Sequence, residues 1–288
     1  MNIRFVTIFL NGFLMIAMPV VLAIILTRKF KLGWRLFWIG AATFVLSQVG
    51  HIPFNALVNP VFNQFGFIAL HPTIQLLIRA VFLGLSAGVF EEFSRYAMYR
   101  WWAKDARSWG RGLLAGTGHG GIEAIIVGAL ALYGFIQIAI LSSVDIAQAV
   151  PAAQVETVRN QVAAALSMPV YMTLLGAVER LFAIPLHIAC SLLVMQAFTR
   201  RRFGWVGLAV LLHALADGTA VVALGMGLSY LAIEGMIGLF AIASVVIIFV
   251  LRQPGPQPDL VPAPVPVTEF TPRPPEETDE NLEKTRYQ

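Results

Sequence analysis

Several residues that can carry chemistry lie inside segments long and apolar enough to cross a bilayer. They are six of the sixteen acidic residues and three of the five histidines: Glu91, Glu92, Glu123, Glu179, Asp217 and Glu234, with His119, His187 and His213. A charged side chain at bilayer depth is costly, so such residues usually serve a buried site. The pattern predicts a polar site inside the membrane.

The spacing of these residues places carboxylates beside histidines. His119 and Glu123 are four residues apart, as are His213 and Asp217, so each pair shares one face of a helix. Three histidines with nearby carboxylates satisfy the ligand chemistry of a catalytic zinc site, although the chain has no His-Glu-x-x-His motif. The same pairs could instead be hydrogen bonds that join helices.

The adjacent residues Glu91 and Glu92 are followed one helical turn later by Arg95. A structural ion pair would use Arg95 with one of the two carboxylates. The other carboxylate remains, and it could take a proton from water as a general base. Adjacent residues on a helix point about 100° apart, so we expect one glutamate to be the base. The other would pair with Arg95 or contact the histidines.

Seven segments predict an all-α fold, a polytopic membrane helical bundle. Each has about 20 or more mostly apolar residues: 5–27, 36–57, 75–99, 112–135, 168–198, 205–226 and 229–251. The composition agrees, because 58% of the residues are hydrophobic and 12% are charged, outside the usual range of soluble globular proteins. The first segment is too long for a signal peptide, and the single cysteine, Cys190, excludes an internal disulfide.

Lysines and arginines alternate between the connections of these segments. They are numerous after the first, third and fifth segments and nearly absent from the other connections. The positive-inside rule therefore predicts an outside amino terminus and a cytoplasmic carboxyl terminus. This orientation places the ionisable residues of the third to sixth segments at a similar depth. We expect them to point into one cavity.

Two parts of the chain lie outside the predicted spans. Residues 142–167 predict a short helix outside the membrane, with Glu156 and Arg159 among alanines and valines. Residues 253–288 contain nine of the sixteen prolines and an acidic run, a composition that cannot bury a core. We therefore predict a transmembrane helical domain, residues 1–252, and a disordered, proline-rich, acidic cytoplasmic tail, residues 253–288.

The remaining polar residues of the spans are expected to lie nearer the outer face. Glu179 and Arg180 favour a structural pair, and Glu234, near the outer end of the seventh segment, favours an interfacial position. His51 and His71 are expected at or beyond the outer boundary, without a part in the site.

The order of the motifs resembles that of a known family. Glu91-Glu92-Phe-Ser-Arg95, then His119-x-x-x-Glu123, then Arg180 followed by His187, then His213-Ala-Leu-Ala-Asp217 resembles the YhfC family of intramembrane metalloproteases. The set is also similar to the wider clan of type II CAAX prenyl proteases and PrsW-type proteases, from about residue 80 to residue 220. Arg95 falls three residues after the second glutamate, and the second motif has both His119 and Glu123. These two departures from the CAAX pattern favour the YhfC or PrsW side.

The resemblance implies roles for individual residues. The catalytic residues would be Glu91, Glu92, Arg95, Glu123 and Asp217, with Glu91 as the base because it matches the first glutamate of the motif. The metal ligands would be His119, His187 and His213. The implied cofactor is a divalent metal, most readily zinc, whereas a glutamate-only mechanism would use the same residues and need no cofactor.

We expect an intramembrane peptidase that hydrolyses a peptide bond of a membrane-embedded or lipid-anchored substrate. Its partners would be a membrane protein or lipidated peptide and the lipid bilayer. Nucleic acid is excluded as a partner because the cations lie in short clusters beside the apolar segments. The expected location is a bacterial plasma membrane. The alternatives are a non-catalytic scaffold and an ion- or proton-coupled transporter, and the latter is disfavoured because the two halves show no inverted repeat.

Overall fold

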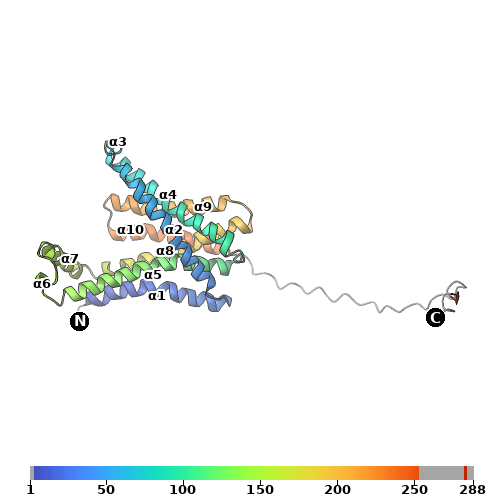
Figure 1. Cartoon of the computed structure of the whole chain (residues 1–288), viewed down its shortest axis with the longest axis horizontal. Coiled ribbons are helices and arrows are strands. Elements are labelled where there is room, and N and C mark those ends of the chain that lie inside the picture. The colour runs from blue at the N-terminus through green and yellow to red at the C-terminus, as the bar shows by residue number, and fades with distance from the viewer. Residues whose placement is uncertain (1–2, 253–281, 284–288) are drawn as a thin grey trace. The chain divides into compact units, whose positions relative to one another are not determined.

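The computed structural model describes residues 3–252 and 282–283 (Figure 1). In this part of the chain, seven helices are long and apolar enough to cross a membrane. They are α1 (Ile3–Phe30), α2 (Arg35–Val58), α4 (Pro72–Ala97), α5 (Trp109–Leu141), α8 (Leu175–Thr199), α9 (Gly204–Gly225) and α10 (Tyr230–Val250). Each overlaps one predicted segment, and residues 3–252 contain no strand. The predicted all-α bundle is confirmed, and its helices satisfy their own backbone hydrogen bonds, as a bilayer requires.

Shorter elements connect these helices. A 3-10 turn, η1 (Asn59–Asn63), and α3 (Phe65–Ile68) join α2 to α4, and a π-helical turn, η2 (Met98–Trp102), extends α4. The predicted helix within residues 142–167 is present as α6 (Ile146–Ala149), η3 (Ala152–Gln154) and α7 (Val155–Ser167), and η4 (Met172–Leu174) leads into α8. The predicted tail, residues 253–288, lies outside the described residues apart from 282–283.

Glycines bring the helices that carry the motifs into backbone contact. A Cβ atom added to Gly118 of α5 would lie 2.0 Å from the carbonyl oxygen of Phe37 in α2. One added to Gly84 of α4 would lie 2.4 Å from the carbonyl oxygen of Ala214 in α9. Only a residue without a side chain permits such an approach. The helices that carry these glycines are therefore closely packed against their neighbours.

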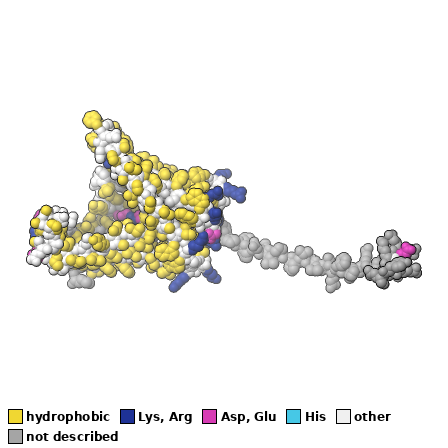
Figure 2. Space-filling view, in the orientation of Figure 1, with side chains coloured by type: hydrophobic (Ala, Val, Ile, Leu, Met, Phe, Trp, Pro, Cys, Tyr) yellow, Lys and Arg dark blue, Asp and Glu magenta, His cyan; other side chains and the backbone are white. Residues whose placement is uncertain are grey.

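Lysine and arginine side chains gather at one end of the bundle (Figure 2). The α1–α2, η2–α5 and α8–α9 connections lie at this end, and α1 begins at the opposite end (Figure 1). The arrangement agrees with the alternation of cationic connections along the sequence. The cytoplasmic orientation of this end stays a prediction.

The packing of α2 changes along its length. Its buried residues run from Leu36 to Ser47, and none of its residues after Ser47 is buried. Beyond that point α2 and α4, joined by α3, extend away from α1 and α5 as an arm (Figure 1). The candidate site lies near the level at which the arm leaves the bundle, because Gln48, the next residue of α2, contacts it.

Candidate metal and catalytic centre

Four helices carry the ionisable residues that were selected from the sequence. These are Glu91, Glu92 and Arg95 on α4, His119 and Glu123 on α5, Glu179, Arg180 and His187 on α8, and His213 and Asp217 on α9. The three histidines, the two glutamates of α4 and the arginine that follows them are all buried. The structure brings these six side chains together in one cluster, which we call the buried cluster.

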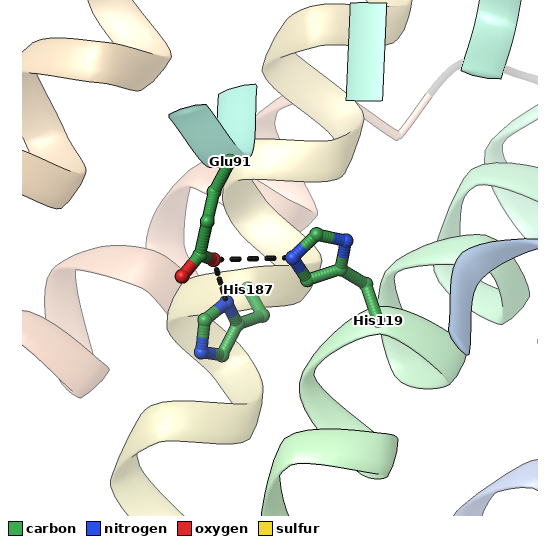
Figure 3. Close-up of side chains that lie close together, drawn as sticks. All are labelled: Glu91, His119 and His187. Carbon is green, nitrogen blue, oxygen red and sulfur yellow. Dashed lines mark hydrogen bonds and ion pairs between the residues drawn. The ribbon is translucent and has the colours of Figure 1, made fainter. Parts of the chain in front are cut away.

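The Glu91 carboxylate faces His119 and His187 within the buried cluster (Figure 3). Its Oε2 atom is 3.1 Å from His119 Nε2 and 3.7 Å from His187 Nδ1. The same oxygen is 3.9 Å from His213 Nε2. Nitrogens of three histidines, from three different helices, therefore surround one carboxylate oxygen.

Glu92 faces a different set of partners. Its Oε1 atom accepts hydrogen bonds from Arg95 Nη1 and from His213 Nδ1, the latter at 2.8 Å. The Glu92 side chain is completely buried. The two adjacent glutamates thus differ as the helix geometry predicts: one faces the histidines, and the other pairs most closely with the arginine.

Arg95 fixes the position of a proton on His187. Its Nη2 atom donates to His187 Nδ1 at 2.7 Å, so this nitrogen is an acceptor and Nε2 carries the hydrogen. His187 Nε2 lies 2.7 Å from Glu123 Oε2, to which it donates. Glu123 therefore holds one side of the ring, and inside the buried cluster the lone pair of Nδ1 accepts from Arg95, which a metal bound at this nitrogen would displace.

His213 is held in a similar way. Its Nδ1 atom donates to the Glu92 carboxylate, so in the neutral ring Nε2 is an acceptor, on the side of Glu91. A carboxylate on one ring nitrogen, with the other nitrogen free to bind, is typical of histidines that ligate metals. His119 differs, because its Nδ1 atom is buried and has no hydrogen-bond partner in the described structure.

The donor atoms of the buried cluster fit a metal ion. One ligand atom each from Glu91, His119 and His187 lie within 4.8 Å of one another. Imidazole nitrogen and carboxylate oxygen are ligands that zinc accepts, and three histidines form a known catalytic zinc set. The residues present therefore suit a divalent metal.

Cys190 lies beside the buried cluster, within ligand distance of Glu92 and His213. Its thiol is buried and contacts the carbonyl oxygen of Ala209 at 3.7 Å. Glu92 Oε1 and His213 Nδ1 already bond each other in this group. Cys190 belongs to the wall of the site.

A second set of charges borders the buried cluster on α5 and α8. Arg180 donates to both Glu123 and Glu179. The predicted pairing of Glu179 with Arg180 is therefore present, and it extends to the carboxylate that holds His187. Glu234 lies apart, in the wall of an apolar groove between α8 and α10, and forms no ion pair among the described residues.

Asp217 is the most accessible of the selected residues on α9. Its Oδ2 atom is 3.5 Å from His213 Nε2, and its side chain is 41% exposed. The Glu123 side chain is 23% exposed. Figure 2 shows acidic side chains recessed in a hollow between the arm and the helices below it. Carboxylates therefore form the accessible edge of the site, whereas its cations and histidines are covered.

Two residues of α2 also belong to the site, and neither was predicted from the sequence. Gln48 Nε2 donates to Glu91 Oε1 at 3.1 Å, and His51 Nδ1 lies 3.3 Å from Gln48 Oε1. His51 was expected at or beyond the outer boundary, whereas it lies within α2 and bonds a residue that contacts Glu91. Gln48 has no charge, so a search for ionisable residues could not find it. Its spacing of three from His51 was the available signal.

Known proteins are similar to this chain over most of its length. A family model described as YhfC intramembrane metalloprotease matches residues 14–247. A Bacillus subtilis (strain 168) protein named "Uncharacterized membrane protein YhfC" is 32% identical over 223 residues. That alignment covers 74% of this chain and 82% of the relative. No solved structure matches. With seven apolar helices, these findings identify a multi-pass integral membrane protein.

Proposed function

Because the chain belongs to the YhfC intramembrane metalloprotease family, we propose that it is a peptidase whose active site is the buried cluster. Its substrate is a membrane-embedded or lipid-anchored peptide, and its product arises by hydrolysis of one peptide bond. The observation that carries the proposal is the position of Glu91, whose Oε2 atom faces three histidine nitrogens within 4 Å.

Three residues would hold the metal: His119, His187 and His213. A divalent metal bound to imidazoles supplies Lewis acidity and makes water a stronger acid near neutral pH. The orientation of His187 by Glu123, and of His213 by Glu92, supports this assignment, since each ring is already turned toward the common space.

Glu91 is the proposed general base. It lies on the side of the histidines, its Oε2 atom accepts rather than donates when ionised, and it is less enclosed than Glu92. Peptide hydrolysis needs a group that removes a proton from water and later returns one to the leaving amine, and a carboxylate in this position can do both. A glutamate-only mechanism would assign Glu91 the same role.

Glu92 and Arg95 are proposed to hold this arrangement. Arg95 contacts both carboxylates and His187, so it limits the repulsion between adjacent negative charges and fixes the ring that Glu123 also binds. Asp217 is proposed to border the substrate, because its exposed carboxylate stands at the accessible edge, next to His213.

Metal analysis of the purified protein tests the ligand assignment. The variants His119→Ala, His187→Ala and His213→Ala should each lose most of the bound metal. The matched control is His71→Ala, because His71 caps the start of α4 and accepts only from the backbone of Thr73. If all three variants keep the wild-type metal content, these histidines do not bind the metal, and the proposed metal site is wrong.

Turnover of a transmembrane or lipid-anchored peptide tests the catalytic assignment. Glu91→Gln keeps the shape of the side chain but removes the proton acceptor, so hydrolysis should fall by about 10²–10⁴-fold with the fold preserved. If Glu91→Gln and Glu92→Gln both retain full turnover, the glutamate pair is not catalytic and a scaffold role replaces the peptidase.

A further inference from the structure

Three polar residues form a stripe along one face of α2 next to the buried cluster. Gln48, His51 and Asn55 are spaced by three and four residues, so they lie one above another on the helix. The residues between them are apolar. Unpaired polar groups are costly within a membrane, so the polar groups of this stripe are expected to form hydrogen bonds.

The hydrogen bonds within the stripe have one consistent direction. Asn55 Nδ2 can only donate, and it lies 2.9 Å from His51 Nε2, so this ring nitrogen is an acceptor. The hydrogen of the neutral ring is then on Nδ1, which donates to Gln48 Oε1 at 3.3 Å. With its oxygen occupied, the Gln48 amide presents Nε2 to Glu91 Oε1 at 3.1 Å.

The surroundings keep this chain of donors in place. The second N–H of the Gln48 amide reaches Ser47 Oγ at 3.4 Å. The His51 ring lies against Phe90 of α4, with 5.6 Å between ring centroids, and its Nε2 atom is 3.1 Å from Ser86 Oγ. Rotation of the Gln48 amide would place its oxygen against the carboxylate of Glu91, so the amide has one favourable orientation.

We propose that Gln48, oriented by His51 and Asn55, is a positioning residue for Glu91. It holds Oε1 of the carboxylate, so that Oε2 alone is presented to the three histidines. Nothing else in the described structure bonds Oε1, because Arg95 and the histidines all contact Oε2. This role rests on the proposed function of Glu91.

Kinetics give the first test. Gln48→Met keeps a side chain of similar length but removes the donor, and Gln48→Glu keeps the shape but places an acceptor against Glu91. Both should lower kcat by about 10–100-fold, the usual effect of losing a group that orients a reacting residue. KM should stay unchanged, because Gln48 is assigned no contact with substrate. His51→Phe should lower kcat less than the Gln48 variants do, and Asn55→Ala should lower kcat least.

Bound Co²⁺ gives a test that is independent of turnover. The visible absorption of Co²⁺ depends on the number and kind of its ligand atoms. A Glu91 carboxylate released from Gln48 is free to turn beside the histidines that would hold Co²⁺, so Gln48→Met should change the Co²⁺ spectrum while the amount of bound Co²⁺ is retained. The control is Gln75→Met, an amide at the start of α4 that donates to the carbonyl oxygens of Ile68 and Leu70.

The outcomes separate the two proposals. Wild-type protein that neither hydrolyses a membrane peptide nor binds Co²⁺ overturns the proposed function and this role with it. An active wild type whose Gln48→Met variant matches it in both kcat and Co²⁺ spectrum overturns the role of Gln48 alone. Equal changes in the Gln48→Met and Gln75→Met proteins would indicate general destabilisation and would also overturn it.

Discussion

Two groups of charged residues in this protein have similar contacts in different surroundings. One is the buried cluster around Arg95. The other, which we call the loop cluster, consists of Asp105 with Arg35 and Arg111 at the cationic end of the bundle. Arg35 and Arg111 each approach Asp105 to 3.0 Å, a normal distance for such a pair.

Their exposure to solvent separates them. The side chains of Arg95 and Glu92 are 0% exposed, whereas those of Arg35 and Asp105 are 57% and 49% exposed. A charge in the interior that loses its partner keeps the full cost of being out of water. An exposed charge that loses its partner is solvated instead. Removing one partner should therefore lower the free energy of unfolding strongly in the buried cluster and only slightly in the loop cluster.

The largest expected effect is that of removing Arg95. Arg95→Ala leaves the carboxylates of Glu91 and Glu92 buried without their cation, which should lower the free energy of unfolding by about 3–5 kcal/mol. The measurement is the thermal unfolding of the purified protein in detergent. Arg35→Ala is the matched control and should change stability by less than about 1 kcal/mol. Similar losses in both variants would contradict the distinction between the two clusters.

The next effect concerns the helix contact that brings α5, with His119, against α2. A methyl group at Gly118 would collide with the Phe37 carbonyl group, so Gly118→Ala should destabilise the protein by about 1–3 kcal/mol. Gly134 lies on the same helix, and a Cβ atom added there would meet nothing within 4 Å. Gly134→Ala should therefore be neutral or stabilising by up to about 1 kcal/mol. If Gly118→Ala and Gly134→Ala change the unfolding midpoint by the same amount, the collision with the Phe37 carbonyl group does not explain the effect.

A smaller effect is expected at the edge of the buried cluster. Glu123→Ala removes the carboxylate that orients His187, so the affinity for zinc should fall by about 10–100-fold. Isothermal titration of the metal-free protein with zinc measures this change. Glu156→Ala is the control, because Glu156 is 74% exposed and bonds only Arg159 of its own helix. Unchanged zinc affinity in Glu123→Ala would remove the orienting role of Glu123.

The helices and the charged members of the buried cluster could be predicted from the sequence. Apolar length located the seven helices, because a bilayer admits few other structures. The motifs on α4, α5, α8 and α9 located the members of the buried cluster, because charges within an apolar segment are conspicuous. The different contacts of Glu91 and Glu92 followed from the 100° between adjacent helical residues.

The partners that carry no charge could not be predicted in the same way. Gln48 and Asn55 are not costly enough to stand out, and their role depends on how α2 is placed against α4. The loop cluster was also not predicted. Arg35 and Asp105 are 70 residues apart, and cations at helix ends are expected for topology alone, whatever they bond.

The smallest expected effect is the pH dependence of the loop cluster. The hydrogen bond from Arg35 lowers the pKa of the Asp105 carboxyl below its usual value, with a further contribution from Arg111. A lowered pKa in the folded state means that ionised Asp105 stabilises the fold above the pKa of the unfolded chain, about 3.9. This contribution is lost as the pH falls through the lower, folded pKa.

At neutral pH, Asp105→Asn should therefore lower the free energy of unfolding by less than about 1 kcal/mol, since the pair is exposed and screened by salt. Unfolding midpoints of wild type and Asp105→Asn, measured from pH 7 down to a pH below the folded pKa of Asp105, should converge at the acidic end. A difference that persists there would show that Asp105 acts through contacts other than its charge, and the contrast with the buried cluster would then need another basis.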